Sequence, residues 1–261
     1  MKAVARRSTK RKRRLKGRVV VVGIGPGGID HMTTKAIQEL RSADSIVGFG
    51  FYINQIHSLV PPSTRIYSSG MGHEIARAST ALELGSRGQK VAVVSGGDPG
   101  VYGMAGPIIE TAKKLRMNVD IVIIPGVTAA TAAAASLGAP IMTDFACVSL
   151  SDLLIPLDRI LERVNAAVKG DLVLVLYNPQ SRARKEPLRR VHKILMAYRK
   201  PTTPVGIVTA YGRAGEKTVV TTLARMLEHE IDMESTIVVG NSSTRTFDQK
   251  ILTPRGYYKP S

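Results

Sequence analysis

The sequence has 261 residues, of which 44% are hydrophobic and 22% charged, so it can bury a sizeable core in one large domain or two ordinary ones. Its single cysteine, Cys147, excludes an intrachain disulfide and a multi-cysteine metal site. No apolar run approaches the roughly 18 residues of a membrane-spanning helix, and no signal peptide is indicated, so we expect a cytoplasmic protein without membrane contact.

The amino-terminal segment 1–18 contains ten Lys or Arg residues and no acid, and it supplies more than half of the net charge of +17. Such a block predicts a disordered basic arm. It could hold a polyanion such as RNA by neutralising phosphates, but it lacks the aromatic residues on which single-strand binders stack bases. We therefore expect nucleic acid to be a partner only through this arm.

A first strand is predicted over residues 19–24, followed by the glycine-rich segment GIGPGG (23–28) and a helix over 35–42. Gly23, Gly25 and Gly28 fit the dinucleotide fingerprint G-x-G-x-x-G. We reject that interpretation, because the helix begins about five residues after the last glycine and the next strand ends without an acid for a ribose. Contact of this loop with another ligand stays open.

Strands and helices alternate through the rest of the chain, which predicts α/β architecture with mostly parallel sheets. We place the basic arm at 1–18, an N-terminal α/β domain at 19–138 and a C-terminal α/β domain at 139–257. Further strands are expected at 45–49, 65–67, 91–94, 119–124, 146–150, 171–177, 205–210, 217–222 and 235–239. Further helices are expected at 50–59, 74–86, 103–115, 129–137, 157–168, 185–199 and 223–228.

The most informative stretch is 91–106, in which a buried strand leads into the segment SGGDPG (95–100) and then a helix. Ligands bind at the carboxyl ends of strands in open α/β sheets, and glycines there let backbone amides approach a ligand. Taken alone, the motif is more typical of a tight turn with Asp98 as a cap. Similar loops after other strands favour a ligand site.

Residues 125–128 (PGVT) precede an alanine-rich helix for which Thr128 is the predicted N-cap. Small residues permit close packing against a ligand or against another helix, and the sequence leaves both open. Cys147 lies in a segment typical of a strand. We interpret it as a small core residue rather than a catalytic thiol.

Seven segments occur in the order found in the tetrapyrrole (corrin/porphyrin) methylases: GIGPGG (23–28), SSGMG (68–72), SGGDPGVYGMAG (95–106), IPGVTAATAAAASLGAP (124–140), LYNPQSRAR (176–184), TAYGRAGE (209–216) and VVGNSSTR (238–245). The chain resembles this family over residues 19–257. Within the family it is similar to the branch that methylates carbon 17 of precorrin-3B or cobalt-precorrin-3, with ring contraction, in vitamin B12 synthesis. The GDPGVYGMA and YNPxSxxR segments together are specific to that branch.

The resemblance implies an S-adenosylmethionine (SAM)-dependent methyltransferase of two α/β domains, with mostly parallel sheets that are mixed in the second domain. It also implies a ligand cleft between the domains and a homodimer. No metal or iron–sulfur cluster is implied, in agreement with five scattered histidines. Carried over position by position, the implied donor-binding residues are Pro26, Gly97, Asp98, Val101, Tyr102, Gly126, Val127, Thr128, Ala129, Tyr177, Ala210 and Asn241.

The implied substrate is an anionic tetrapyrrole, whose carboxylates arginine can bind in bidentate fashion. The candidates for substrate binding are Ser69, Met71, Arg182, Arg184 and Arg213, although arginines on solvated loops are the commoner outcome for any one of them. The acid and base of the ring contraction stay unassigned. So does the choice between a metal-free and a cobalt-containing substrate.

Two alternatives stay open. An enzyme of the same fold could methylate another corrin ring carbon, an RNA or a protein side chain, and the basic arm would suit RNA. A nucleic-acid-binding protein with an incidental α/β body would rest on the arm alone.

Overall fold

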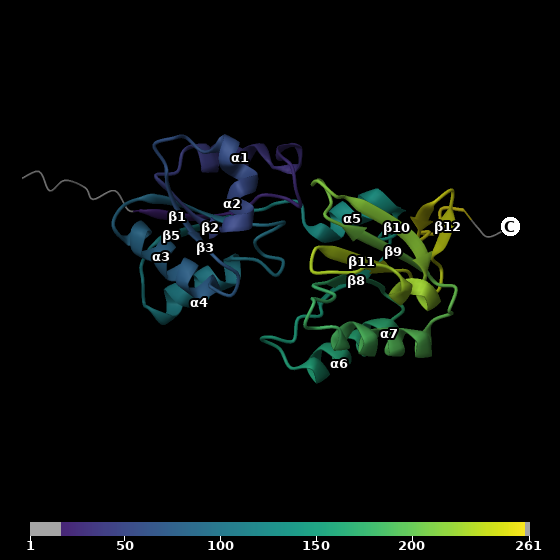
Figure 1. Ribbon diagram of the computed structural model, residues 1–261. Helices are drawn as coiled ribbons and strands as arrows, with labels where there is room; N and C mark the ends of the chain where they lie inside the picture. The colour runs from purple at the N-terminus through teal and green to yellow at the C-terminus, as the bar shows by residue number, and fades with distance from the viewer. Residues whose placement is uncertain (1–16, 259–261) are drawn as a thin grey trace, which may run out of the picture. The chain divides into compact units, whose positions relative to one another are not determined.

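The computed structural model describes residues 17–258, which divide into two compact units (Figure 1). Unit 1 contains the described part of Met1–Val22 together with Lys35–Ser95 and Gly103–Ile124. Unit 2 contains Gly23–Thr34, Gly96–Tyr102 and the described part of Pro125–Ser261. The predicted basic arm lies outside the described residues, except for Gly17 and Arg18.

The sheet of unit 1 has five strands: β1 (Arg18–Gly23), β2 (Ser45–Phe49), β3 (Arg65–Ser69), β4 (Lys90–Ser95) and β5 (Asp120–Ile124). Their order is β3-β2-β4-β1-β5, and β2 pairs with β3 and β4, and β1 with β5, in parallel register. The central strands are buried along nearly their whole length. Their continuous valine runs are typical of a parallel sheet that is covered on both faces.

Helices cover both faces of this sheet (Figure 1). They are α1 (Thr34–Arg41) and α2 (Gly50–Ile56) on one face, and α3 (Glu74–Ser86) and α4 (Ala105–Lys114) on the other. Val19 and Val21 belong to the core under α3 and α4, and strand alternation turns Val20 and Val22 to the opposite face. Two short 3₁₀ helices, η1 (Ile29–His31) and η2 (His57–Leu59), lie in the connections.

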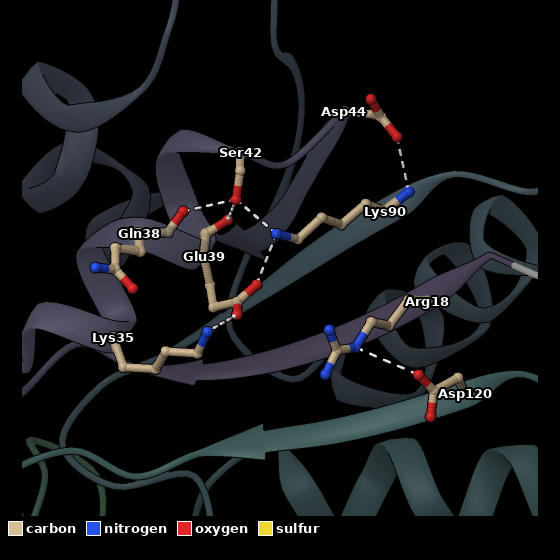
Figure 2. A network of polar contacts seen from close by, with 8 residues as sticks. All are labelled: Arg18, Lys35, Gln38, Glu39, Ser42, Asp44, Lys90 and Asp120. Atoms are coloured by element: carbon tan, nitrogen blue, oxygen red, sulfur yellow. Dashed lines mark hydrogen bonds and ion pairs between the residues drawn. The ribbon is translucent and has the colours of Figure 1, made fainter.

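Polar side chains tie α1 to the amino-terminal end of the sheet (Figure 2). The carboxylate of Glu39 is buried and lies 2.7 Å from the Nζ atoms of both Lys35 and Lys90. Burial raises the pKa of this carboxyl, but hydrogen bonds from the two lysines outweigh burial and hold the pKa below its ordinary value. The backbone N–H of Lys90 donates to Asp44 Oδ2 at 2.8 Å.

Arg18 begins β1, although the sequence placed it in the basic arm. Its Nε lies 3.3 Å from Oδ2 of Asp120, the first residue of the paired strand β5 (Figure 2). The sequence did not assign Arg18 to the strand, because charge alone does not distinguish an arm from the first residue of a strand. Arg18 and Lys90 start their strands, so these contacts lie at the edge opposite the glycine-rich loops.

The sheet of unit 2 also has five strands: β7 (Phe145–Ser149), β8 (Val173–Tyr177), β9 (Pro204–Thr209), β10 (Lys217–Thr222) and β11 (Ser235–Val239). Their order is β10-β9-β11-β8-β7. The β7–β8 pair is parallel, whereas β11 runs antiparallel to both β8 and β9, and β10 antiparallel to β9. The carboxyl ends of β7, β8 and β9 therefore share one edge, and β11 ends at the other.

Helix α5 (Ala129–Leu137) covers one face of this sheet, and α6 (Leu157–Lys169), α7 (Glu186–Tyr198) and the 3₁₀ helix η3 (Leu223–Glu228) cover the other (Figure 1). Val173 and Val175 pack with α5, while Leu174 and Leu176 pack with α6 and α7. A Cβ on Gly206 would lie 2.3 Å from Leu137 Cδ1, so the glycine lets α5 approach β9 closely.

A small third sheet, which the sequence did not predict, has the order β12-β13-β6. It consists of β6 (Gly138–Ala139), β12 (Arg245–Phe247) and β13 (Lys250–Leu252). The hairpin between β12 and β13 turns through Asp248 and Gln249, both at positive φ (44° and 60°). Without a glycine in the turn, the usual sequence signal of a tight hairpin is missing.

The predicted α/β architecture with a mixed second sheet is confirmed. The helix over 129–137, which the sequence assigned to the N-terminal domain, packs on the sheet of unit 2, because the chain leaves unit 1 at Ile124.

The segment 223–228 is a 3₁₀ helix rather than an α-helix. Within residues 17–258, no helix combines the length and the apolar character that crossing a membrane requires.

Candidate functional site

Three glycines, one at the end of β1 and the others in the loops after β4 and β5, pack backbone against backbone in unit 2. A Cβ on Gly126 would lie 2.2 Å from Gly97 O and 2.9 Å from Gly23 C, and a Cβ on Gly23 would lie 2.7 Å from Gly126 N. Gly97 has a φ of +62°, and it exchanges two backbone hydrogen bonds with Gly25, of 2.7 and 3.1 Å. Side chains do not fit here, which explains the residue type at each position. We call Gly23, Gly97 and Gly126 the three-glycine junction.

Asp98 binds the loops of this junction together with its carboxylate. Oδ1 accepts a hydrogen bond from the Gly100 amide at 2.7 Å, and Oδ2 accepts one from the Gly126 amide at 3.0 Å. The geometry therefore bears out the turn-forming role that the sequence left open. A carboxylate has about four acceptor sites, so these two bonds leave room for a contact with the donor, which stays a prediction.

The hydroxyl of Tyr177, at the carboxyl end of β8, caps the amino end of α5. It accepts a hydrogen bond from the Ala130 amide at 2.8 Å and lies 2.7 Å from Thr128 Oγ1. Thr128 occupies the predicted N-cap position, but its own hydroxyl makes no capping bond. Burial raises the pKa of the Tyr177 phenol, so the hydroxyl keeps its proton at neutral pH.

Tyr102 joins the GDPG loop to the same edge of the unit 2 sheet. Its ring centroid lies 5.1 Å from that of Tyr177, and its hydroxyl donates to Cys147 O at 3.0 Å. Its φ of +54° is unusual for a bulky residue, and 54% of the residue is exposed.

Cys147 packs against the core beneath α5, and burial raises the pKa of its thiol, in agreement with a core role.

The first glycine-rich loop, 23–28, docks on the loop that follows β9. A Cβ on Gly27 would lie 2.4 Å from Arg213 Cγ and 2.7 Å from Tyr211 O. His31 Nδ1 donates to Gly27 O at 2.8 Å, and its ring meets that of Tyr211 edge-on at 5.1 Å. Ala210, with a φ of +52°, begins this loop. Hence Pro26 and Ala210 lie in two loops that touch.

The guanidinium of Arg184 binds backbone carbonyls and a carboxylate of the same chain. Its Nη1 donates to Leu150 O at 2.6 Å, and its Nη2 donates to Asn178 O at 3.0 Å. Its Nε lies 3.7 Å from Asp152 Oδ1. The guanidinium thus holds the segment after β8 against the segment after β7. Substrate binding by Arg184 would require these contacts to be shared or broken.

The other two arginine candidates differ in their surroundings. Arg213 forms an ion pair with Glu234 at 3.2 Å and is largely covered by protein. Arg182 is exposed on the loop after β8. Of the three arginines, Arg182 therefore offers the most accessible guanidinium.

Asn241 does not lie with the other donor candidates, and this prediction is corrected. It follows β11, whose last residue, Val239, pairs with Leu174 and Val205 near the amino ends of β8 and β9. Its amide donates to Asp171 O at 3.1 Å, before β8 begins. The sequence showed a polar loop after a strand but not the antiparallel direction of that strand, which reverses the edge.

Ser69 is the last residue of β3, and Met71 lies in the loop that joins β3 to α3 in unit 1. Met71 is 70% exposed, and Gly72 has a φ of +80° with open space around it. Ser69 is held by Arg77, whose Nη1 donates to Ser69 Oγ at 3.0 Å. Arg77 was not singled out from the sequence, because one basic residue on an amphipathic helix carries no recognisable signal.

The remaining donor candidates, Val101, Val127 and Ala129, lie in the loops that the three-glycine junction connects, and all are half-buried. In the part of the chain that the structure describes, no three His, Cys, Asp or Glu residues gather in a way that could hold a metal ion. Sequence reasoning missed the capping role of Tyr177 and the contacts of Tyr211. Both depend on which loops meet, and no local pattern encodes that.

Comparisons with known proteins give the family. The model of the Tetrapyrrole (Corrin/Porphyrin) Methylases matches residues 18–227. A "Probable cobalt-factor III C(17)-methyltransferase" of Salmonella typhimurium is 43% identical over 237 residues, covering 91% of this chain and 98% of that protein. A "Cobalt-factor III methyltransferase" of Priestia megaterium is 42% identical over 249 residues. That alignment covers 94% of this chain but 46% of the relative, so the chain spans about half the length of that protein.

Comparison with solved structures also finds methyltransferases. The methyltransferase CobJ matches with a TM-score of 0.86 at 34% identity, over 91% of this chain and 100% of that one. The cobalt precorrin-4 methyltransferase CbiF shares the fold, with a TM-score of 0.71 at 23% identity over 85% and 94% of the two chains. The family model covers well over half of the sequence. This chain belongs to the tetrapyrrole (corrin/porphyrin) methylase family.

Proposed function

We propose that this chain is a SAM-dependent methyltransferase that methylates carbon 17 of a corrinoid of the cobalt-factor III type. The observation that carries the proposal is the three-glycine junction beside the amino end of α5. The chain that contains this junction is 43% identical to a relative named for that reaction, over 91% of this chain and 98% of the relative. The relatives' names favour the cobalt-containing form over metal-free precorrin-3B.

The backbone around Gly97 fits a methyl donor. A Cβ on Gly97 would point toward the segment 127–129, at 3.8 Å from Thr128 Cα and 3.9 Å from Ala129 N. A longer side chain would fill the space before the first turn of α5. Glycine leaves that space to a ligand, and the amino end of a helix attracts a carboxylate such as that of the methionine moiety. The aromatic pair of Tyr102 and Tyr177 adds apolar surface nearby.

Bound SAM supplies an already activated methyl group, so the protein needs no nucleophilic side chain. Its residues must orient the two reactants, because holding the reacting carbon atoms about 3–3.5 Å apart removes much of the entropic barrier. We assign this orienting role to the loops of the junction, which Asp98 and Tyr177 hold in place through hydrogen bonds. These groups carry no net positive charge toward the sulfonium, whose charge fades in the transition state.

We assign recognition of the anionic tetrapyrrole to Ser69, Met71 and Arg182. Arg182 is the exposed guanidinium that can pair with a substrate carboxylate in bidentate fashion. Arg184 instead positions the loop that carries Arg182, through its bonds to Leu150 O and Asn178 O. Arg213 positions the loop after β9.

The test is incubation of the protein with labelled SAM and with cobalt-factor III or precorrin-3B, followed by mass spectrometry and NMR of the product. Methylation at carbon 17 supports the proposal, and methylation at another ring carbon gives the neighbouring alternative within the family. Binding of S-adenosylhomocysteine (SAH) is measured separately by thermal shift. At a hundredfold excess over its dissociation constant, a ligand adds about 2.7 kcal/mol to stability. No shift at millimolar SAH would overturn the donor assignment.

We further propose that the protein is a cytoplasmic homodimer that works without a resident metal or iron–sulfur cluster. The resemblance to the family motivates all three statements. Leu153 and Leu154 are 82% and 96% exposed and supply apolar surface of the kind that subunits bury. Light scattering after size exclusion tests the dimer, and metal analysis of active protein tests the absence of a resident metal. The basic arm leaves nucleic acid as a weak additional partner.

A further inference from the structure

Arg77 lies at a position where both burial and the helix dipole disfavour a positive charge. It lies in the first turn of α3, where the helix dipole disfavours positive charge, and it is only 6% exposed. Burying a charge is unfavourable unless hydrogen bonds compensate, so this arginine must have strong partners. Those partners lie in the loop before the helix and in the first helical residue.

The partners of Arg77 fix the loop after β3 at several points. Its Nη1 donates to Ser69 Oγ at 3.0 Å and to Gly70 O at 2.7 Å, and its Nη2 donates to Glu74 Oε1 at 2.7 Å. The same Glu74 oxygen accepts from the Gly72 amide at 3.3 Å. The guanidinium and the carboxylate thus hold both sides of Met71 without covering it.

This loop has little other support. It follows β3, which is the edge strand of its sheet and pairs with β2 alone. A Cβ on Gly72 would meet nothing within 4 Å, so no other part of the chain packs over the turn at this residue. Met71 and Ile75, on either side of the turn, are 70% and 59% exposed. They form an apolar surface of a kind that suits the flat face of a macrocycle.

We propose that Arg77 is a positioning residue for the corrinoid: it holds the loop 69–72 so that Met71 contacts the tetrapyrrole. The inference rests on the proposed function and deepens it. Arg77 acts through the loop and does not itself contact the substrate. Binding of the methyl donor, which involves residues of unit 2, is independent of this clamp.

The test compares Arg77→Lys with Arg87→Lys. Lysine keeps the charge but cannot form the fork of bonds to the loop and to Glu74. Arg87, at the end of the same helix, forms an exposed ion pair with Glu83 at 3.9 Å and serves as the control. For R77K we expect the dissociation constant of cobalt-factor III, followed by its visible absorption, to rise about tenfold, the factor that 1.4 kcal/mol supplies. The affinity for SAH should stay within twofold in both variants.

A second comparison separates positioning from mere stability. Met71→Ala should weaken corrinoid binding in the wild-type background but have little further effect in R77K, because the loop is then already misplaced. Hydrogen exchange at residues 70–72 should rise in R77K only. If R77K fails to fold, Glu74→Gln weakens the ion pair that holds Arg77 at the start of the helix and should give a smaller loss of corrinoid affinity.

The outcomes distinguish the two proposals. A wild-type protein that binds neither SAH nor cobalt-factor III overturns the proposed function itself. A wild-type protein that binds both, with R77K and E74Q binding the corrinoid as tightly as R87K does, overturns the positioning role alone. Additive effects of M71A and R77K would also overturn it.

Discussion

Asp98 Oδ2 accepts a hydrogen bond of 3.0 Å from the backbone amide of Gly126, 28 residues further along the chain. The bond joins the loop after β4 to the loop after β5, where the backbones of Gly97 and Gly126 are already in contact. A single carboxylate therefore fixes the two loops to which we assign the methyl donor. It explains why a short acidic turn lies at this point of the chain.

Asp98→Asn should fold but bind SAH at least tenfold more weakly, because one carboxylate oxygen is replaced by an NH₂ group that faces a backbone donor. Leaving a buried amide without its acceptor costs about 1–3 kcal/mol. Isothermal titration with SAH and urea unfolding measure the two effects. Asp44→Asn is the matched control, since Asp44 also accepts from a backbone amide, that of Lys90, in unit 1 (Figure 2). Equal SAH affinity in D98N and D44N would show that Asp98 does not organise the donor site.

Gly126→Ala should lose both stability and SAH affinity. Its Cβ would lie 2.2 Å from the Gly97 carbonyl, a backbone atom that cannot rotate away. Overpacking of this kind costs about 1–3 kcal/mol and displaces the loop. Gly106→Ala is the control, because a Cβ at this position in α4 meets nothing within 4 Å. That variant should gain up to about 1 kcal/mol from helix propensity. A G126A protein as stable as G106A would contradict the close packing of the junction.

Tyr177→Phe should weaken SAH binding and lower the free energy of unfolding by about 1–3 kcal/mol, since the Ala130 amide and the Thr128 hydroxyl lose their shared partner. Tyr198→Phe, at the exposed end of α7, should change neither. Burial raises the pKa of Tyr177 above the usual value of about 10. The stability linked to its proton is therefore fully present below pH 10 and is lost only as the pH rises beyond it. SAH affinity that depends on Tyr177 ionisation near neutral pH would contradict this assignment.

Much of the fold could be predicted from the sequence, because continuous valine strands alternate with amphipathic helices whose lengths match the elements found. The strand direction of β11 could not, since nothing in residues 235–239 says whether a strand runs parallel or antiparallel to its neighbours. That one direction removed Asn241 from the site. The partners of Arg184 could not be predicted either, because an arginine after a strand has the same sequence pattern whether its guanidinium faces solvent or two backbone carbonyls.

The sequence showed that glycines gather in these loops, but it did not show which part of the chain each glycine packs against. From the sequence, Gly23 and Gly126 fitted close approach to a ligand, but each is required first by the other's backbone. The tyrosine cap on α5 likewise depends on a contact 47 residues apart in the chain, between Tyr177 and Ala130. Local patterns find loops, and only tertiary structure shows which loops meet.

Glu39→Gln should destabilise unit 1 by about 1–3 kcal/mol at pH 7, because Lys35 and Lys90 lose their common buried partner. The pKa of Glu39 lies below its ordinary value of 4.5, since the lysine hydrogen bonds outweigh burial. The stability it contributes is therefore present above pH 4.5 and is lost as the pH falls below it. Urea unfolding between pH 3 and 7 should show a weaker acid dependence in E39Q than in the wild type. Glu83→Gln, which breaks an exposed pair with Arg87, should leave that dependence unchanged.

A truncation that begins at Gly17 should keep the fold, because Gly17 and Arg18 already contact Gly85 and Asp120. It removes nine Lys and Arg residues, which lowers the net charge from +17 to +8. Charge of this size speeds capture of an anionic substrate, and salt screens it, since the Debye length is about 8 Å at physiological ionic strength. The kcat/KM of truncated and full-length protein should therefore differ at low salt and converge at high salt. A truncation that is inactive at every salt concentration would place the arm in the site and revive an RNA-directed activity.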